Sequence, residues 1–103
     1  MKKRIVALLC IVVMAVSLAA CGSEITIGVS FGQNVHPFFV AMQLGIEQAC
    51  EDYGIENVNI LAADSSLETQ VTQIENLVTM GCDVILLNTY DTDGVVNEVA
   101  AAN

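Results

Sequence analysis

The chain has 103 residues, of which 54% are hydrophobic, and its twelve acidic residues against three basic ones give a net charge of -9 at pH 7. The basic residues are Lys2, Lys3 and Arg4, so no Lys or Arg follows residue 4. A protein surface with acidic but almost no basic side chains repels phosphate backbones. The composition therefore argues against nucleic acid and polyanionic ligands and favours a neutral or cationic solute.

The first 21 residues have the layout of an export signal. The basic cluster precedes an apolar stretch, 5–20, that is interrupted only by Ser17, and this predicts a signal peptide over residues 1–20. The stretch ends in Leu-Ala-Ala-Cys at 18–21, which resembles a bacterial lipobox, so we expect Cys21 to carry lipid and residues 21–24 to form a short linker. An uncleaved membrane helix is the alternative, because a span needs about 17 residues or more. Either alternative places the remainder outside the cytoplasm.

A strand followed by a helix is predicted next. Residues 25–30 alternate in the manner of a strand, 31–36 form a loop, and Pro37 suits a first helical turn, where a missing N–H costs nothing. Apolar residues then recur at helical spacing until Gly54 ends the run. The members of this stripe are Phe38, Met42, Ile46, Ala49, Cys50 and Tyr53.

The same unit repeats once more along the chain. Residues 58–62 form a short apolar strand, 63–65 turn the chain, and a second helix ends at Gly81. Ser65 and Glu68 have the spacing of a capping box at the start of this helix. Its apolar stripe consists of Leu67, Val71, Ile74, Leu77 and Val78.

The third unit completes a β-α-β-α-β-α order. Residues 84–87 are a continuous apolar run typical of a buried parallel strand, 89–92 form a loop, and a helix begins at Asp93. The fold class is therefore α/β, an open parallel sheet with flanking helices. Right-handed crossovers place the three loops after the strands along one edge, where open α/β sheets bind ligands. We interpret residues 25–103 as an incomplete lobe, because a three-stranded sheet on so short a chain buries a limited core.

Two cysteines remain once Cys10 is lost with the signal peptide and Cys21 is lipidated. Cys50 lies on the apolar face of the first helix and Cys82 directly follows Gly81. Their separation does not match metal-ligand spacing, so core packing is the favoured role, with a disulfide left open.

Several short motifs occur here in a familiar order: Ile27 to Ser30, His36 to Val40, Met80 to Asn88, and Asp91 to Asp93. Together, over residues 24–103, they resemble the opening of a ribose-type periplasmic binding protein. The resemblance implies a two-lobed protein that encloses a sugar at its hinge and delivers it to an ABC permease, of which this chain is an N-terminal fragment. A sensor that presents sugar or autoinducer to a membrane receptor is the alternative role on the same fold.

The resemblance also implies where the sugar binds. Its contacts fall in the loop after the first strand and at the start of the first helix, namely Ser30, Asn34, His36, Phe38 and Phe39. Sugar rings lay their C–H faces on aromatic rings, and their hydroxyls pair with amide or imidazole groups. Phe38 or Phe39 is therefore placed to supply a stacking face. The alternative is that one of them points inward as core, because adjacent residues on a helix cannot both face the same way.

Two aspartates are expected at the same sheet edge. Asp64 and Asp91 follow the second and third strands, so either carboxylate is placed to accept from sugar hydroxyls, and we include Asp91 among the candidate ligand contacts. Helix capping and turn formation is the favoured alternative for both, since Asp is preferred at such positions.

Catalysis finds no support in these residues. The chain has no glycine-rich phosphate loop and no Gly-x-Ser-x-Gly elbow, and its one histidine allows neither a triad nor a histidine-based metal site. We therefore expect no catalytic residues, cofactor or metal, with a flavodoxin-like enzyme domain as the alternative from another class. The expected partners are a small sugar, a membrane permease and, through the lipid, the membrane itself.

Overall fold

The computed structural model describes residues 24–103. The predicted signal peptide, residues 1–20, and the predicted lipidation site, Cys21, lie outside the described residues and stay predictions.

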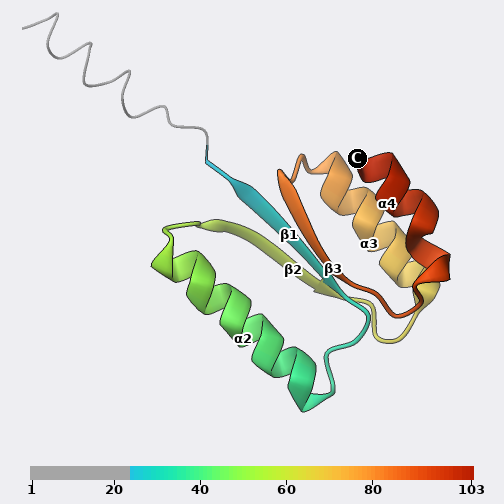
Figure 1. The fold of residues 1–103 in the computed structure, drawn as a ribbon, viewed down its shortest axis with the longest axis horizontal. Helices are drawn as coiled ribbons and strands as arrows, with labels where there is room; N and C mark the ends of the chain where they lie inside the picture. Colours follow the sequence, from blue (N-terminus) through green and yellow to red (C-terminus); the bar gives the residue numbers. More distant parts are fainter. Residues whose placement is uncertain (1–23) are drawn as a thin grey trace, which may run out of the picture.

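A three-stranded parallel sheet forms the middle layer of the fold (Figure 1). Its strands are β1 (Thr26–Phe31), β2 (Asn57–Ala62) and β3 (Val84–Asn88), in the order β2-β1-β3. In this register Val29 of the central strand lies beside Ile60 on one side and Leu86 on the other. The predicted α/β class with an open parallel sheet is confirmed, and each predicted strand is observed within one residue of its expected bounds.

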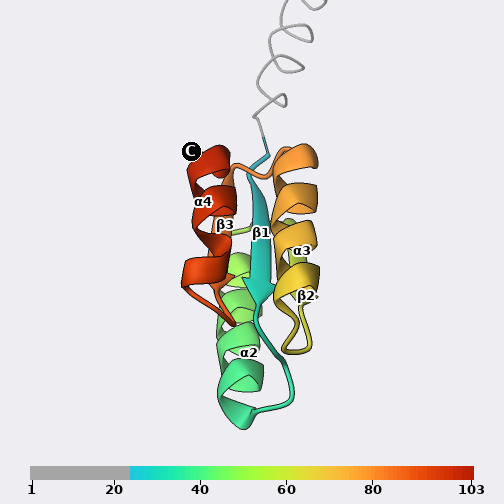
Figure 2. The same ribbon diagram turned by 90° about the vertical axis from the view of Figure 1, so that its right-hand side faces the viewer.

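Helices cover both faces of this sheet. They are α2 (Pro37–Asp52), α3 (Leu67–Thr79) and α4 (Val96–Ala102), the last preceded by a 3-10 turn, η1 (Asp93–Val95). Figures 1 and 2 show α2 on one face of the sheet and α3 with α4 on the other. The predicted third helix is therefore present but starts as a 3-10 turn.

The ends of α2 follow the sequence signals closely. Pro37 occupies the first turn, and the side chain of His36 caps it by accepting from the N–H of Phe38. At the other end the N–H of Tyr53 bonds to the Ala49 carbonyl, and Gly54 takes a φ of 68°. Glycine adopts this left-handed conformation without the steric cost that a Cβ brings, so it ends the helix where the sequence predicts.

The start of α3 differs from its prediction, and the capping box of Ser65 and Glu68 is wrong. Asp64 and Ser65 both have positive φ, 50° and 65°, and the N–H of Ser66 bonds to the carbonyl of Ala63 at 2.9 Å. Two such central residues define a type I′ turn. Because the turn uses Ser65, the helix is capped one residue later, by Ser66, whose Oγ accepts from the N–H of Thr69 at 3.2 Å.

The core lies mainly between β1 and α3. Leu77 and Ile74 of α3 are buried against the sheet, and Leu77 packs directly over Gly28 of β1. A Cβ on Gly28 would approach the Leu77 side chain to 2.9 Å and the Cys82 Sγ to 3.1 Å. The glycine is therefore what allows helix and strand to approach so closely.

The outer strand β3 is incompletely covered. Val84 and Leu86, which point to the same side as Val29 of the central strand, remain 46% and 41% exposed. Apolar strand residues of this kind are normally buried in parallel sheets. Within residues 24–103 they are covered only in part, with Leu86 lining a hollow beside Met42 and Ile46 of α2.

Cys50 is buried, Cys82 is half-buried, and both are free thiols. Core packing, the favoured role for both, agrees with this arrangement. Among the described residues, no helix has the length and apolar character needed to cross a bilayer.

Candidate functional site

Backbone hydrogen bonds tie the three loops together at the carboxyl edge of the sheet. The N–H of Gly32 bonds to the Asn88 carbonyl, and the carbonyl of Gly32 accepts from the N–H of Ser65, both at 2.8 Å. The chain after β1 is thus held by the end of β3 on one side and by the turn after β2 on the other. A Cβ at Gly32 would lie 2.6 Å from the backbone nitrogen of Tyr90, so this close approach requires glycine.

Aromatic rings gather where this edge meets α2. Phe39 packs edge-on against three neighbouring rings, with centroid distances of 6.1 Å to Phe31, 5.4 Å to Phe38 and 6.5 Å to His36. Phe31 is only 2% exposed, whereas Phe38 is 57% exposed. Phe39 is therefore the member of the pair that anchors α2 to the core, and Phe38 is the one with an open ring.

His36 is fixed by the cap that it makes. Its Nδ1 accepts from the N–H of Phe38 at 3.2 Å, and the residue is exposed. Because Nδ1 is occupied by this cap, Nε2 is the ring nitrogen left to bond a ligand. The rings of His36 and Phe38 both pack on Phe39, so an imidazole and an exposed aromatic ring belong to one cluster, a combination suited to a hydroxylated ring compound.

Ser30 does not reach the open edge. It is 0% exposed, and its Oγ donates to Gln73 Oε1 at 3.4 Å and accepts from Gln70 Nε2 at 3.3 Å. The structure therefore gives this hydroxyl internal partners on α3, and the role that it supports is to hold the end of β1 in place.

The other predicted contacts lie in the loops. Asn34 is exposed between β1 and α2. Asp91 is exposed after β3, and its Oδ1 accepts from the N–H groups of Asp93 and Gly94 at 3.0 and 3.2 Å. This is the capping role that the sequence favours for Asp91, and the turn conformation of Asp64 agrees with the turn role. The structure brings His36, Phe38 and Phe39 together, with Asn34 in the same loop and Asp91 in a neighbouring one.

Two glutamines on α3 were not among the predicted site residues. Gln70 and Gln73 are placed one turn apart and bind the ends of all three strands through Asn88, Ser30 and Ala62. The sequence contained a signal for Gln70, because its spacing places it on the same helical face as the apolar residues Ile74 and Leu77. A polar residue on a buried stripe marks a side chain that must have partners.

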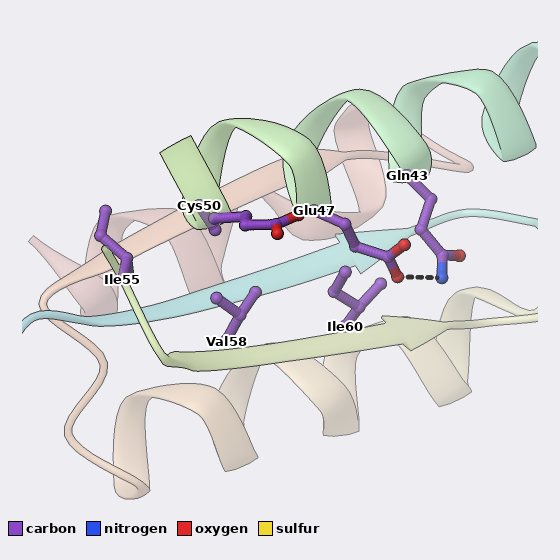
Figure 3. Close-up of a pocket in the computed structure, with 7 residues that line it drawn as sticks. Gln43, Glu47, Cys50, Ile55, Val58 and Ile60 are labelled. Atoms are coloured by element: carbon purple, nitrogen blue, oxygen red, sulfur yellow. Dashed lines mark hydrogen bonds between the residues drawn. The ribbon is translucent and has the colours of Figure 1, made fainter. Parts of the chain in front are cut away.

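A second hollow lies away from this edge, between α2 and β2 (Figure 3). Val58, Ile60 and Ile55 form its apolar side, and on α2 the Gln43 amide donates to the Glu47 carboxylate at 2.8 Å. It contains none of the predicted site residues, and it opens at the outer edge of the sheet beside β2.

Within residues 24–103 no three His, Cys, Asp or Glu side chains come together as a metal would require. What the carboxyl edge offers is a ring face, an imidazole donor, amides and carboxylates, groups that recognise a solute by stacking and hydrogen bonding.

Comparison with known proteins decides the family. A family model described as a periplasmic binding protein domain matches residues 27–103. The chain belongs to the periplasmic binding protein family. The resemblance drawn from the sequence motifs is thereby confirmed, and the family name places its members outside the cytoplasm.

Relatives in this family are named as binding proteins of import systems. The ribose import binding protein RbsB of Bacillus subtilis (strain 168) is 34% identical over 80 residues, which cover 78% of this chain and 26% of the relative. Its counterpart in Haemophilus influenzae is 29% identical over 90 residues, covering 87% and 30%. The chain thus spans less than a third of the length of the curated relatives that it matches.

A solved solute-binding protein shares the fold. The crystal structure of an ABC transporter solute-binding protein from Mycobacterium smegmatis, with bound glycerol, superimposes with a TM-score of 0.70 at 25% identity. The match covers 77% of this chain and 27% of that one. These relatives are binding proteins rather than enzymes, in agreement with the expected absence of catalytic machinery.

Proposed function

We propose that this chain forms the sugar-binding edge of an extracytoplasmic protein that captures a monosaccharide for uptake by an ABC importer. The observation that carries the proposal is the exposed ring of Phe38 and the imidazole of His36, both packed on Phe39 at the carboxyl edge of a parallel sheet. The net charge of -9 fits an uncharged solute better than an anionic one. The names of the relatives, ribose import binding proteins, make D-ribose the first solute to test.

Binding in this proposal uses the edge as one half of a site. Phe38 lies against the apolar face of the sugar ring, His36 donates to a hydroxyl, and Asn34 and Asp91 supply further polar contacts. A second lobe, beyond the part of the relatives that this chain matches, closes over the opposite face of the sugar. The sugar stabilises the closed form because it contacts both lobes only there, and that form docks on the permease.

We further propose that Cys21 anchors the protein to the membrane. Its support is the basic cluster, the apolar stretch and the lipobox-like 18–21. Cells expressing the protein and fed radiolabelled palmitate are expected to label it, and Cys21→Ser is expected to abolish labelling and leave an unprocessed precursor. Equal labelling of the Cys21→Ser protein would refute the anchor while leaving the binding proposal untouched.

The binding proposal is tested by a thermal-shift screen of neutral monosaccharides against the full-length protein without its signal peptide. D-ribose or another monosaccharide is expected to raise the midpoint of unfolding in a concentration-dependent way, because a ligand bound only by the folded state stabilises it. Stabilisation by amino acids or an autoinducer instead of any monosaccharide would contradict the sugar assignment.

A further inference from the structure

Gln70 is a polar side chain in a position that the helix pattern reserves for an apolar one. It lies on α3 between Ser66 and Ile74 and is 0% exposed. Burying an amide is unfavourable unless its donors and acceptor are paired. The hydrogen bonds of the Gln70 amide therefore explain why this side chain is buried here.

The amide of Gln70 bonds to two different strand ends and to one loop. Its Nε2 donates to the Asn88 carbonyl at 3.1 Å and to Ser30 Oγ at 3.3 Å. Its Oε1 accepts from the N–H of Tyr90 at 2.8 Å and from Thr89 Oγ1 at 3.5 Å. One side chain thus joins the end of β1, the end of β3 and the loop after β3.

Tyr90 is held from a second side as well. The backbone of Gly32 approaches it so closely that a Cβ there would lie 2.6 Å from the Tyr90 nitrogen and 2.9 Å from its Cβ. Gly32 begins the loop that leads to His36. Two contacts, one from α3 and one from the loop after β1, therefore fix the backbone at Tyr90, whose own side chain is exposed at the edge.

We infer that Gln70 is a positioning residue for the sugar site: through the Tyr90 N–H it sets the spacing between the 89–92 loop and the loop that carries His36 and leads to Phe38 on α2. The inference rests on the proposed function. Gln70 itself does not touch the sugar, because it is buried beneath the edge. Ligand groups on two loops bind one solute well only if their separation is held constant, so losing this bond weakens binding.

The neighbouring Gln73 provides a matched control. It lies one turn further along α3, and its Nε2 donates to the Ala62 carbonyl at the end of β2. Its Oε1 accepts from Ser30 Oγ, as noted above, but it has no bond to the 89–92 loop. Gln70→Met and Gln73→Met both remove an amide from the same helix face with little change in volume, and only the first releases Tyr90.

The experiment measures amide hydrogen exchange at Tyr90 and the Kd for D-ribose in the full-length protein and both variants. Gln70→Met is expected to speed Tyr90 exchange and raise Kd, each by about tenfold. Gln73→Met is expected to change both by less than about twofold, at a temperature where all three proteins are folded. Gly32→Ala leaves the Gln70 side-chain amide intact but adds a Cβ that clashes with the Tyr90 backbone. It is expected to raise Kd as well.

Each outcome decides the inference. Faster Tyr90 exchange with an unchanged Kd in Gln70→Met would overturn it, since the loop would then be free without consequence for the sugar. An equal rise in Kd for the two Met variants would also overturn it, because general destabilisation of α3 would explain both. If the unmodified protein bound no monosaccharide, the proposed function itself would fall, and this inference with it.

Discussion

The rings of Phe31 and Phe39 meet edge to face, with centroids 6.1 Å apart and planes inclined by 66°. This contact joins the last residue of β1 to the first turn of α2, so the loop between them is held at both ends. His36 and Phe38 flank the anchored ring. Their position at the edge of the sheet therefore depends on a core contact rather than on the loop alone.

The two phenylalanines of α2 are expected to separate stability from binding. Phe39→Ala removes a ring that packs on Phe31, and we expect it to lower the free energy of unfolding by about 2 kcal/mol. Phe38→Ala removes an exposed ring and is expected to change stability by less than about 0.5 kcal/mol while raising the Kd for D-ribose about tenfold. Urea denaturation and calorimetric titration of the full-length protein measure the two effects. A Phe38→Ala protein with unchanged affinity would contradict the assignment of this ring to the site.

Gly28 and Gly45 make a matched pair for the packing of β1 on α3. Gly28→Ala places a methyl group 2.9 Å from the fully buried Leu77 side chain and 3.1 Å from the Cys82 Sγ. We expect overpacking to cost about 1–3 kcal/mol. Gly45→Ala, on α2, meets nothing within 4 Å and is expected to stabilise the protein by about 0.5–1 kcal/mol. Urea denaturation compares the two, and a Gly28→Ala protein as stable as Gly45→Ala would refute this close packing.

Ser65 and Ser66 test where α3 begins. Ser66→Ala removes the side-chain cap on Thr69 and is expected to lower the free energy of unfolding by about 1 kcal/mol. Ser65→Gly relieves a left-handed residue with a φ of 65° and is expected to leave stability unchanged or raise it by up to about 1 kcal/mol. If Ser65 capped the helix, as the Ser65–Glu68 spacing suggests, Ser65→Ala would carry the larger loss and Ser66→Ala would be nearly neutral.

Much of this fold could be predicted from the sequence because its signals are local. Apolar periodicity predicted the strands and helices, and Gly54 and Gly81, both with positive φ, ended the first two helices as expected. The capping residue of α3 could not be chosen correctly, since Ser65 and Ser66 are both good caps and only the backbone of the preceding turn distinguishes them.

The candidate site was predictable only in part. The loop after β1 follows from the order of strand, loop and helix. The helical spacing, however, placed Phe38 on the apolar stripe, whereas the structure leaves it 57% exposed and packs Phe39 on Phe31 instead. Gln70 could not be assigned its partners, because Ser30 and Asn88 lie 40 and 18 positions away along the chain and meet it only through the sheet. For the same reason, the sequence could not show that the Ser30 hydroxyl is turned toward α3.

The most direct test of the account is to map the bound sugar onto the chain by NMR, following backbone amide shifts of the isotopically labelled full-length protein during a D-ribose titration. We predict saturable shifts in residues 32–39 and 89–92, at the carboxyl edge of the sheet. Shifts confined instead to the hollow between α2 and β2, around Glu47 and Val58 (Figure 3), would contradict the site assigned here.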